Sequence, residues 1–371
     1  MRSITEAGDL RGKFVLLRSS LNIPLKDGVV RNKFRLNRAL PTLRYLQEQG
    51  AKTIVVSHIG RAPEETLKPV FTELEKHLPI HWGGNVATEG FRQRKEVMHD
   101  GDILLAENLR QDKREKENNS DFVEILASLG DIYVNDAFAA AHREHASTYG
   151  VAQKLPAYAG LTFVQEVTEL SKVMDPKHPS LFILGGAKFD TKMPLVQKYL
   201  DIYDHVFIGG ALANDVLKAR GYEVGQSLVS EISLKDSPFL HDKKLLIPID
   251  VIVDGPDGRQ VKNLDKVSTE DKILDCGPLT IDMLVTYVEK AKTILWNGPL
   301  GAYEIGYTES TEIVARHVAA ADAFTVIGGG DTVAAVEKLQ INDLFSFVSI
   351  GGGSMLTFLE HGSTPVIDSL N

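Results

Sequence analysis

The sequence predicts an α/β fold built from two doubly wound parallel-sheet domains. Short apolar runs, typical of buried strands, alternate with segments of helical periodicity along the whole chain. In the second half, several of these runs end in glycines that precede a helical pattern. The length of 371 residues accommodates two domains of ordinary size. Strands that alternate with helices across short connections indicate parallel sheets with helices on both faces.

The first half alternates predicted strands and helices. The strands are expected at 13–18, 52–57, 102–106 and 132–134, and the helices at 35–49, 67–77 and 121–129. The helix at 35–49 ends at Gly50, because glycine adopts the left-handed backbone conformation that closes a helix. A further helix at about 160–173 ends before Asp175 and Pro176, and we interpret it as the connector between the two halves.

Predicted strands of the second half run into glycines. They are expected at 181–184, 205–208, 324–327 and 347–350. Glycine lets backbone approach a ligand closely because no Cβ intervenes, and the start of the following helix attracts anions. The carboxyl ends of parallel strands share one crevice, where open α/β sheets bind ligands. Tight turns without a ligand are the alternative interpretation. Asp331 follows the glycines at 328–330 and would either cap its helix or hold a cation beside an anion.

The chain divides into regions by pattern. We expect one domain at 1–158 with a C-terminal tail at about 358–371, a connector at 159–175, and a second domain at 176–357. A less regular insert at 229–275 contains Pro248, Pro256 and Gly258, which is compatible with a hairpin.

Composition and charge exclude several classes of protein. Hydrophobic residues make up 43% of the chain, and no apolar run approaches the roughly 18 residues of a transmembrane helix. The formal net charge of −9 argues against a general nucleic-acid-binding protein. Cys276 is the only cysteine, so neither an intramolecular disulfide nor a thiolate metal site is expected. The first residues lack the apolar stretch of a signal peptide. We therefore expect a cytoplasmic protein that binds neither membrane nor nucleic acid. We also expect a monomer, although these features do not determine the oligomeric state.

Polar and cationic residues follow the predicted strands of the first half. They are Asn22, His58, Arg61, Arg110 and Arg143, with Arg35 at the start of the first helix. We expect them to converge, because the carboxyl ends of parallel strands lie at one edge of a sheet. Guanidinium groups bind phosphate and carboxylate bidentately, so such a cluster suits a small, multiply charged acid. For any one of these arginines, a surface ion pair is the alternative.

The two halves together suit phosphoryl transfer between a nucleotide and a small acid. The second half supplies the glycines, together with Lys188, Lys192 and Asp331. Phosphoryl transfer depends on positioning and on neutralisation of charge by Mg²⁺ and cations. The chain lacks the Gly-x-x-x-x-Gly-Lys-Ser/Thr sequence of P-loop enzymes, and no Gly-x-Gly-x-x-Gly fingerprint of dinucleotide-binding proteins follows a strand. Both of those classes are therefore disfavoured.

Ordered motifs along nearly the whole chain resemble the phosphoglycerate kinase family. They are Leu-Asn-Ile-Pro-Leu at 21–25, Ser-His-Ile-Gly-Arg at 57–61, Glu-Asn-Leu-Arg at 107–110, Tyr-Val-Asn-Asp-Ala-Phe at 133–138, His-Arg-Glu-His-Ala-Ser-Thr at 142–148, Leu-Gly-Gly-Ala-Lys at 184–188, Gly-Tyr-Glu-Val-Gly at 221–225, Trp-Asn-Gly-Pro-Leu-Gly at 296–301 and Gly-Gly-Gly-Asp-Thr at 328–332. The resemblance implies a bilobal kinase with a hinge helix. Its first lobe would bind 3-phosphoglycerate or 1,3-bisphosphoglycerate, and its second lobe would bind ATP or ADP with Mg²⁺.

The resemblance also implies roles for individual residues. The phosphoglycerate site would contain Asn22, Arg35, His58, Arg61, Arg110 and Arg143. The nucleotide site would contain Gly186, Lys188, Lys192, Asn297, Glu304, Gly329, Gly330, Asp331 and Thr332. Glu304 would contact the ribose and Asp331 the metal. The catalytic residues would be Arg35, Lys188 and Lys192, of which Arg35 and Lys188 would stabilise the phosphoryl group during transfer.

Several positions depart from the family's usual sequence. Ser19 and Ser20 replace Val-Asp, of which the aspartate contacts the acid. Other replacements are Ala139, Ala140, Gln165, Ala211 and Ile350. Three interpretations remain open: an ordinary divergent kinase, a kinase with altered acid or nucleotide preference, and a catalytically weak paralogue that binds ligands. We favour the first, because the lysines, the arginines and the Gly-Gly-Gly-Asp-Thr sequence remain.

Overall fold

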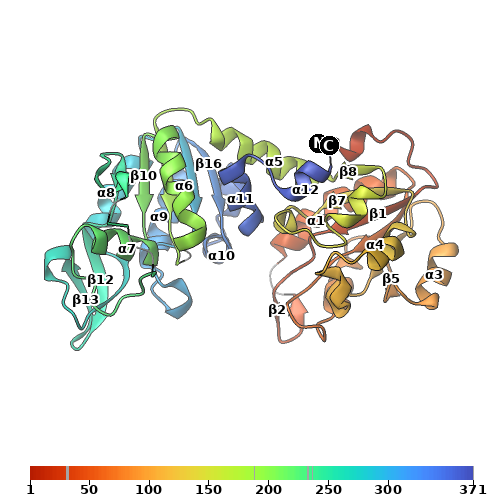
Figure 1. Cartoon of the computed structure of the whole chain (residues 1–371), viewed down its shortest axis with the longest axis horizontal. Coiled ribbons are helices and arrows are strands. Elements are labelled where there is room, and N and C mark those ends of the chain that lie inside the picture. Colours follow the sequence, from red (N-terminus) through yellow and green to blue (C-terminus); the bar gives the residue numbers. More distant parts are fainter. Residues whose placement is uncertain (31–32, 188, 232–233, 236, 371) are drawn as a thin grey trace. The chain divides into compact units, whose positions relative to one another are not determined.

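The fold consists of two α/β units. The structure is a computed structural model that describes residues 1–30, 33–187, 189–231, 234–235 and 237–370. One compact unit contains residues 1–168 and the chain from Ser363 onward, and the other contains residues 169–362. Each has a six-stranded parallel sheet, so the predicted fold class is confirmed (Figure 1). Helix α5, Leu161–Met174, begins in the first unit and ends in the second.

The sheet of the first unit has the order β5-β6-β4-β1-β7-β8, and all neighbours are parallel. Its strands are β1 Phe14–Ser19, β4 Lys52–Val56, β5 His81–Gly84, β6 Ile103–Ala106, β7 Ile132–Asp136 and β8 Ala157–Ala159. A small hairpin, β2 Leu25–Lys26 and β3 Val29–Val30, follows β1. The other helices are α1 Phe34–Glu48, α2 Lys68–Leu74, α3 Glu89–Glu96, α4 Ser120–Ala127 and α12 Pro365–Ser369. The chain winds from β1 toward β5 and then returns to the other side of β1 at β7, which makes the sheet doubly wound.

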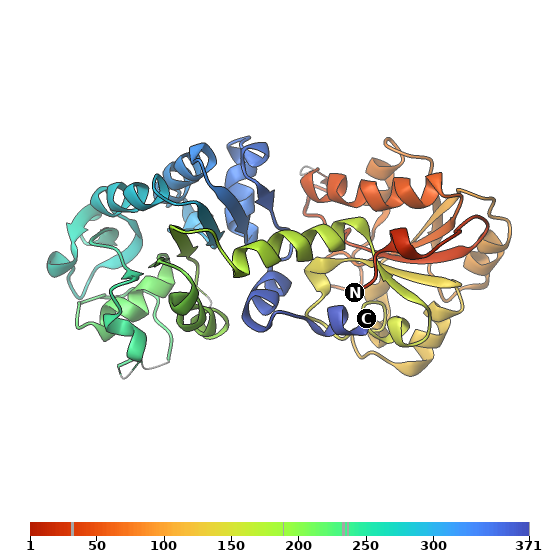
Figure 2. The same ribbon diagram turned by 90° about the horizontal axis from the view of Figure 1, so that it is seen from above.

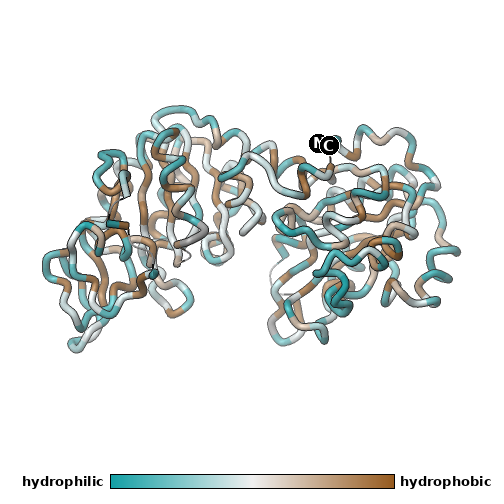
Figure 3. The backbone as a smooth tube through the Cα atoms, in the orientation of Figure 1, coloured by the Kyte–Doolittle hydropathy of each residue, from teal (hydrophilic) through white to brown (hydrophobic). Residues whose placement is uncertain are grey.

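One hydrophobic cluster of the first unit covers a face of this sheet. Val15 and Leu17 point to the same face because side chains alternate along a strand. They belong to one buried cluster with Leu36, Leu40 and Leu43, whose spacing forms an apolar stripe along α1. Figure 3 shows the same contrast between hydrophobic strands and more polar connections in both units. None of the helices within the described ranges is long and apolar enough to cross a membrane.

The main sheet of the second unit has the order β11-β10-β9-β15-β16-β17, again with parallel neighbours. Its strands are β9 Ser180–Leu184, β10 His205–Ile208, β11 Leu245–Leu246, β15 Thr293–Asn297, β16 Phe324–Gly328 and β17 Phe347–Val348. The helices are α6 Phe189–Ile202, α7 Ala211–Ala219, α8 Pro278–Val288, α9 Glu309–Ala320, α10 Gly330–Lys338 and α11 Gly353–His361. Right-handed crossovers place α6 and α7 on one face and α9 and α10 on the other. The chain reverses direction between β9 and β15, which is where doubly wound sheets bind ligands.

An antiparallel sheet with the order β13-β12-β14 completes the second unit. Its strands are β12 Asp250–Gly255, β13 Gly258–Asn263 and β14 Lys272–Cys276. Pro256 and Asp257 form the two-residue turn between β12 and β13. The sequence between 229 and 275 therefore does contain a hairpin.

Some predicted boundaries differ from the structure. The predicted strand at 347–350 contains only Phe347–Val348, because the Ser349 hydroxyl accepts the Gly351 N–H at 3.1 Å and turns the chain. The predicted helix at 67–77 ends at Leu74. Strand β5 was not predicted because its two glycines lower strand propensity. Glycine is needed there, since a Cβ on Gly83 would lie 2.4 Å from the Phe91 ring.

The two chain termini meet in the first unit (Figure 2). The Arg2 N–H donates to the Leu370 carbonyl oxygen at 3.5 Å. Nearby, the Val366 N–H donates to the Ala141 carbonyl oxygen at 3.3 Å. Helix α12 is thereby attached to the segment that follows β7.

Candidate active-site residues in the two units

Cationic side chains gather at the carboxyl edge of the first sheet. His58 follows β4, Arg110 lies in the 3₁₀ turn Leu109–Gln111 after β6, and Arg143 follows β7. Burial lowers the pKa of His58, and the charge of Arg18 lowers that pKa further. Arg110 and Arg143 also lower the pKa of His58, so both lie close to its imidazole. The charges of these residues thus act on one another at this edge of the sheet.

Arg110 is buried, but not all of its N–H groups form hydrogen bonds within the described residues. Its Nη1 donates to the Gly60 carbonyl oxygen, whereas its Nε has no hydrogen-bond partner among the residues that the structure describes. Burial lowers the pKa of Arg110, and the charges of Arg143 and Arg18 lower it further. Among the described residues, the charges of Glu115 and Glu65 raise it. Positive charge is therefore in excess here, and a bound anion would compensate it.

The loop after β4 is fixed by side chains from neighbouring segments. The side-chain Oδ1 of Asn22 accepts the Gly60 N–H at 2.9 Å. The Glu65 carboxylate accepts the N–H of Arg61 at 2.5 Å and that of Ala62 at 2.7 Å. The Arg61 side chain is exposed. Asn22 and Arg61 thus flank the residue whose carbonyl oxygen accepts a hydrogen bond from the Arg110 guanidinium.

Arg35 lies in the first turn of α1 and is half-buried. The chain enters α1 from the carboxyl end of β1, so the helix begins at the same sheet edge as the cationic residues. The positive end of the helix dipole adds to the charge at this edge. Arg143 is exposed, and its Nε donates to His142 Nε2 at 3.0 Å.

Arg18, near the end of β1, was not predicted. It is fully buried, with 0% of its surface exposed. Its Nε donates to Ser147 Oγ at 2.9 Å, and its Nη1 donates to the Ser19 carbonyl oxygen at 2.5 Å. The sequence signal was a charge at the end of an apolar strand, because charges are buried only when they are paired. Ser147 lies in the motif at 142–148, but nothing in the sequence paired it with Arg18 or with Glu115.

Glycines after the strands of the second sheet bring loop backbones together. The Gly186 N–H donates to the Pro299 carbonyl oxygen at 2.8 Å, and the Gly185 N–H to the Asn297 carbonyl oxygen at 2.9 Å. Gly298 has a φ of +96°, and a Cβ there would lie 2.3 Å from the Gly185 carbonyl oxygen. Close packing between loops therefore requires part of the glycine pattern. This agrees in part with the alternative interpretation of tight turns.

The start of α10 is more open. Gly330 is exposed, and a Cβ on it would meet nothing within 4 Å. Asp331 is also exposed and lies in the first turn, whereas Gly329 is the N-cap residue. The interpretation of Asp331 as an N-cap residue is therefore wrong. Thr332 is buried, and its Oγ1 accepts the Gly298 N–H at 3.0 Å.

The other predicted nucleotide-site residues differ in exposure. Lys192 is buried in α6, and its Nζ donates to the Gly185 carbonyl oxygen at 2.5 Å. Asn297 is buried at the end of β15. Glu304 is exposed in the 3₁₀ turn Tyr303–Ile305. Lys188 lies outside the described residues.

The side chains at the start of α10 fit a magnesium ion that arrives with a nucleotide. Within the described ranges, no three His, Cys, Asp or Glu side chains gather as a metal centre. Mg²⁺ usually keeps several waters and binds one or two carboxylates together with substrate phosphates. A single exposed carboxylate, that of Asp331, at a helix start suited to phosphate meets this requirement.

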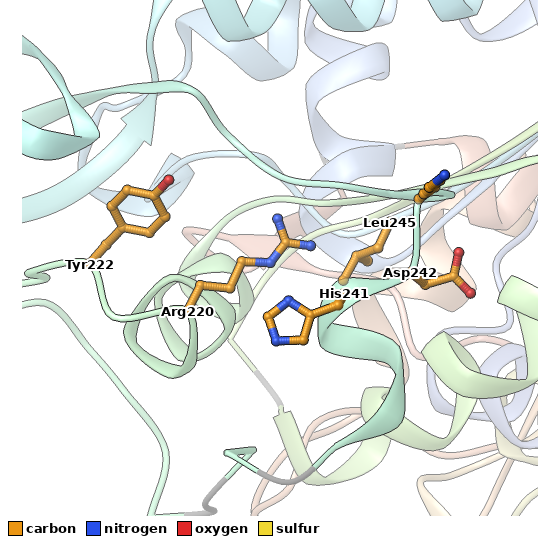
Figure 4. Close-up of a pocket in the computed structure, with 6 residues that line it drawn as sticks. Arg220, Tyr222, His241, Asp242 and Leu245 are labelled. Atoms are coloured by element: carbon orange, nitrogen blue, oxygen red, sulfur yellow. The ribbon is translucent and has the colours of Figure 1, made fainter.

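A hollow of about 420 Å³ lies elsewhere in the second unit (Figure 4). Its lining residues are Arg220, Tyr222, His241, Asp242, Lys243 and Leu245. They come from the end of α7 and the segment that leads into β11. Helix α7 begins at the carboxyl end of β10, so its last residues lie toward the opposite edge of the sheet. The hollow contains none of the predicted site residues.

Solved structures define the class of protein. The structure aligns with phosphoglycerate kinase from Coxiella burnetii with a TM-score of 0.84 and 37% identity, covering 99% of this chain and 97% of that one. The phosphoglycerate kinase from Pyrococcus horikoshii gives a TM-score of 0.86 and 28% identity, covering 100% and 98%. The two α/β units thus define a kinase of the two-domain, parallel-sheet class.

Sequence comparisons identify the family. A family model described as phosphoglycerate kinase matches residues 4–362. The phosphoglycerate kinase of Dictyoglomus turgidum is 39% identical over 96% of this chain and 95% of its own length. That of Moorella thermoacetica is 40% identical, over 98% and 97%. The chain belongs to the phosphoglycerate kinase family, and its function is that of a phosphoglycerate kinase. A weak ligand-binding paralogue and a kinase for another acid are not favoured.

Proposed function

We propose that the chain transfers a phosphoryl group reversibly between 1,3-bisphosphoglycerate and MgADP, giving 3-phosphoglycerate and MgATP. In the reverse direction the acceptor is a carboxyl group. The first unit binds the acid, and the second binds the nucleotide. The excess of positive charge around Arg110 carries this proposal, because an acid with both a phosphate and a carboxylate would compensate it.

The proposed acid-binding residues are Asn22, Arg35, His58, Arg61, Arg110 and Arg143. The unpartnered Nε of Arg110 supports its part, because a buried donor gains most from an anionic acceptor. Arg35 acts on the transferring phosphoryl group. Its place in the first turn of α1, beside the positive end of the helix dipole, supports this role.

The proposed nucleotide-binding residues are Gly186, Lys188, Lys192, Asn297, Glu304, Gly329, Gly330, Asp331 and Thr332. The exposed first turn of α10 supports phosphate binding, because the first N–H groups of a helix have no partners within it. Lys192 is a buried cation whose Nζ donates to the Gly185 carbonyl oxygen, so its charge lies beside the glycines at which phosphate would bind. Lys192 and Lys188 act as the catalytic cations of this unit.

Asp331 would hold Mg²⁺ together with the nucleotide phosphates. The bound ion supplies charge neutralisation to the phosphates. The proposed nucleotide-binding residues around the ion would hold the phosphates in position for transfer. We further propose that the protein works in the cytoplasm as a monomer.

A coupled assay of ATP-dependent phosphorylation of 3-phosphoglycerate tests the reaction. Lack of turnover, with binding of both ligands intact, would contradict it and restore the ligand-binding alternative. Calorimetry tests the metal assignment. In Asp331→Ala, MgADP binding should weaken while binding of metal-free ADP changes less. Asp343→Ala, which removes an exposed aspartate from a later turn, is the matched control. Equal losses for both forms of ADP would remove Asp331 from the metal site.

A further inference from the structure

A directed chain of hydrogen bonds runs beneath the cationic cluster of the first unit. Arginine only donates, so Ser147 Oγ must accept from Arg18 Nε, at 2.9 Å. The Ser147 hydroxyl hydrogen then goes to Glu115 Oε1 at 2.6 Å. Glu115 Oε2 accepts the Ser147 N–H at 3.0 Å. Both carboxylate oxygens therefore act as acceptors. The donor and the acceptor of each hydrogen bond in the chain are thus fixed.

Glu115 is the counter-charge that this chain brings to Arg18. Both residues are buried, at 1% and 0% exposed. Burial lowers the pKa of Arg18, and Glu115 is the largest influence that raises it again. Burial likewise raises the pKa of Glu115, while the charge of Arg18 and the bonds from Ser147 oppose that rise. The two charges are thus paired through one serine. This pairing offsets part of the desolvation cost of the buried guanidinium.

The Nη2 atom of the Arg18 guanidinium determines the protonation and tautomer of His58. Arg18 Nη2 lies 2.5 Å from His58 Nδ1. Since guanidinium has no acceptor, Nδ1 must carry no proton. A neutral imidazole with a bare Nδ1 carries its proton on Nε2, so Nε2 is a hydrogen-bond donor.

The surroundings of His58 agree with a neutral ring. Arg18, Arg110, Arg143 and His145 all face it, and each lowers its pKa in addition to burial. His145 is itself neutral in this setting, because burial and then Arg18 lower its pKa to about 4. A protonated His58 would place an N–H against the N–H of Arg18 at hydrogen-bond distance.

We propose that Arg18 is a positioning residue, held by Glu115 through Ser147, that fixes His58 as the Nε2–H tautomer. His58 then offers a directed, neutral N–H to an anionic oxygen of the acid, while Arg110 and Arg143 supply the charge. This inference rests on the proposed function, because it takes His58 as a residue that binds the acid. It assigns roles to Arg18, Ser147 and Glu115.

Nitrogen-15 NMR of histidine-labelled full-length protein tests the tautomer without any substrate. The His58 signals, assigned with His58→Gln, should show an unprotonated Nδ1 and a protonated Nε2 from about pH 6 to pH 8. In Arg18→Met the ring should become a mixture of tautomers and titrate within that range. Ser147→Ala, a smaller change, should shift the spectrum in the same direction if Arg18→Met does not fold. Arg114→Met is the control, because Arg114 pairs with Asp112 outside the chain of hydrogen bonds.

Steady-state kinetics test the link to the acid. In Arg18→Met the KM for 3-phosphoglycerate should rise roughly tenfold, with the KM for ATP unchanged. A protonated Nδ1 in the wild type, or an unchanged His58 spectrum in both Arg18→Met and Ser147→Ala, would overturn the proposal. A changed tautomer with an unchanged KM would overturn the positioning role. A wild type without kinase activity would instead overturn the proposed function, since the NMR result does not depend on turnover.

Discussion

The carboxyl edges of the two main sheets, where we propose that the two anionic ligands bind, are built in different ways. The first unit uses side chains, with Arg18 and Arg110 buried and connected to partners from distant segments. The second unit uses backbone, with Gly185 and Gly298 bringing loops together and the first turn of α10 left open. A side-chain site is sensitive to the loss of one charge, whereas a backbone site is sensitive to the gain of one Cβ.

The difference also suits the proposed ligands. An acid without its own metal needs fixed positive charge from the protein. A nucleotide binds together with Mg²⁺, which neutralises part of the phosphate charge. Backbone N–H groups and one carboxylate are therefore sufficient to bind it in the second unit. Four substitutions test how far this comparison holds.

Loss of Arg35 should have the largest effect. Arg35→Ala removes a cation from the proposed phosphoryl path, and such cations contribute about 10³–10⁵ in rate. Steady-state assays should therefore show a fall in kcat of that order with a nearly unchanged KM for ATP. Arg44→Ala, which removes an exposed arginine from the same helix, should have little effect. A normal kcat in Arg35→Ala would remove Arg35 from the mechanism.

A methyl group on Gly298 tests the backbone site. Gly298 and Gly306 have nearly equal φ values, +96° and +95°, but a Cβ on Gly306 would meet nothing within 4 Å. Gly306→Ala should cost about 1–2 kcal/mol from backbone strain alone. Gly298→Ala should cost about 2 kcal/mol more, because the Cβ meets the Gly185 carbonyl oxygen. Urea unfolding measures both variants, and equal losses would mean that loop packing does not require this glycine.

The pH dependence of stability should be alike in the two units. Burial raises the pKa of Asp136 in the first unit to about 6, and that of Asp275 in the second to about 6. A raised carboxyl pKa means that the folded state binds a proton that the unfolded state has released. The resulting stability is present below about pH 4 and is lost as the pH rises to about 6.

Asp136→Asn isolates this contribution in the first unit. The variant cannot ionise, so its stability relative to the wild type should improve by about 2–3 kcal/mol between pH 4 and pH 7. Urea unfolding at both pH values measures the difference. A constant difference between Asp136→Asn and wild type would show that folding does not raise the pKa of Asp136.

Ser20 should have the smallest effect. The family's usual aspartate at this position accepts hydrogen bonds from the acid, and Ser20 is a buried, neutral replacement. Bonds to charged groups exceed neutral ones by on the order of 1 kcal/mol, so Ser20→Asp should lower the KM for 3-phosphoglycerate several-fold. The KM for ATP should stay nearly the same, and Ser20→Asn controls for size. A raised KM for 3-phosphoglycerate in Ser20→Asp would show that the pocket is adapted to serine.

The sequence by itself determined that strands and helices alternate, because burial in a parallel sheet requires continuous apolar runs such as 52–57 and 324–327. It also placed the proposed site residues at strand ends and contained the motifs that resemble the family. It did not reveal β5. Glycine occurs in this strand because a Cβ on Gly83 would collide with the Phe91 ring, and glycine lowers the local strand propensity.

The tertiary structure decided which polar groups meet. Arg18 and Ser147 are 129 residues apart, and Ser147 and Glu115 are 32 apart, yet they form one chain of hydrogen bonds. It also decided that Gly298 faces backbone, whereas Gly330 faces open space. A local sequence pattern reports the burial and periodicity of one segment. The partner of a buried charge is set by how separate segments pack, because desolvation makes an unpaired charge costly wherever the chain places it.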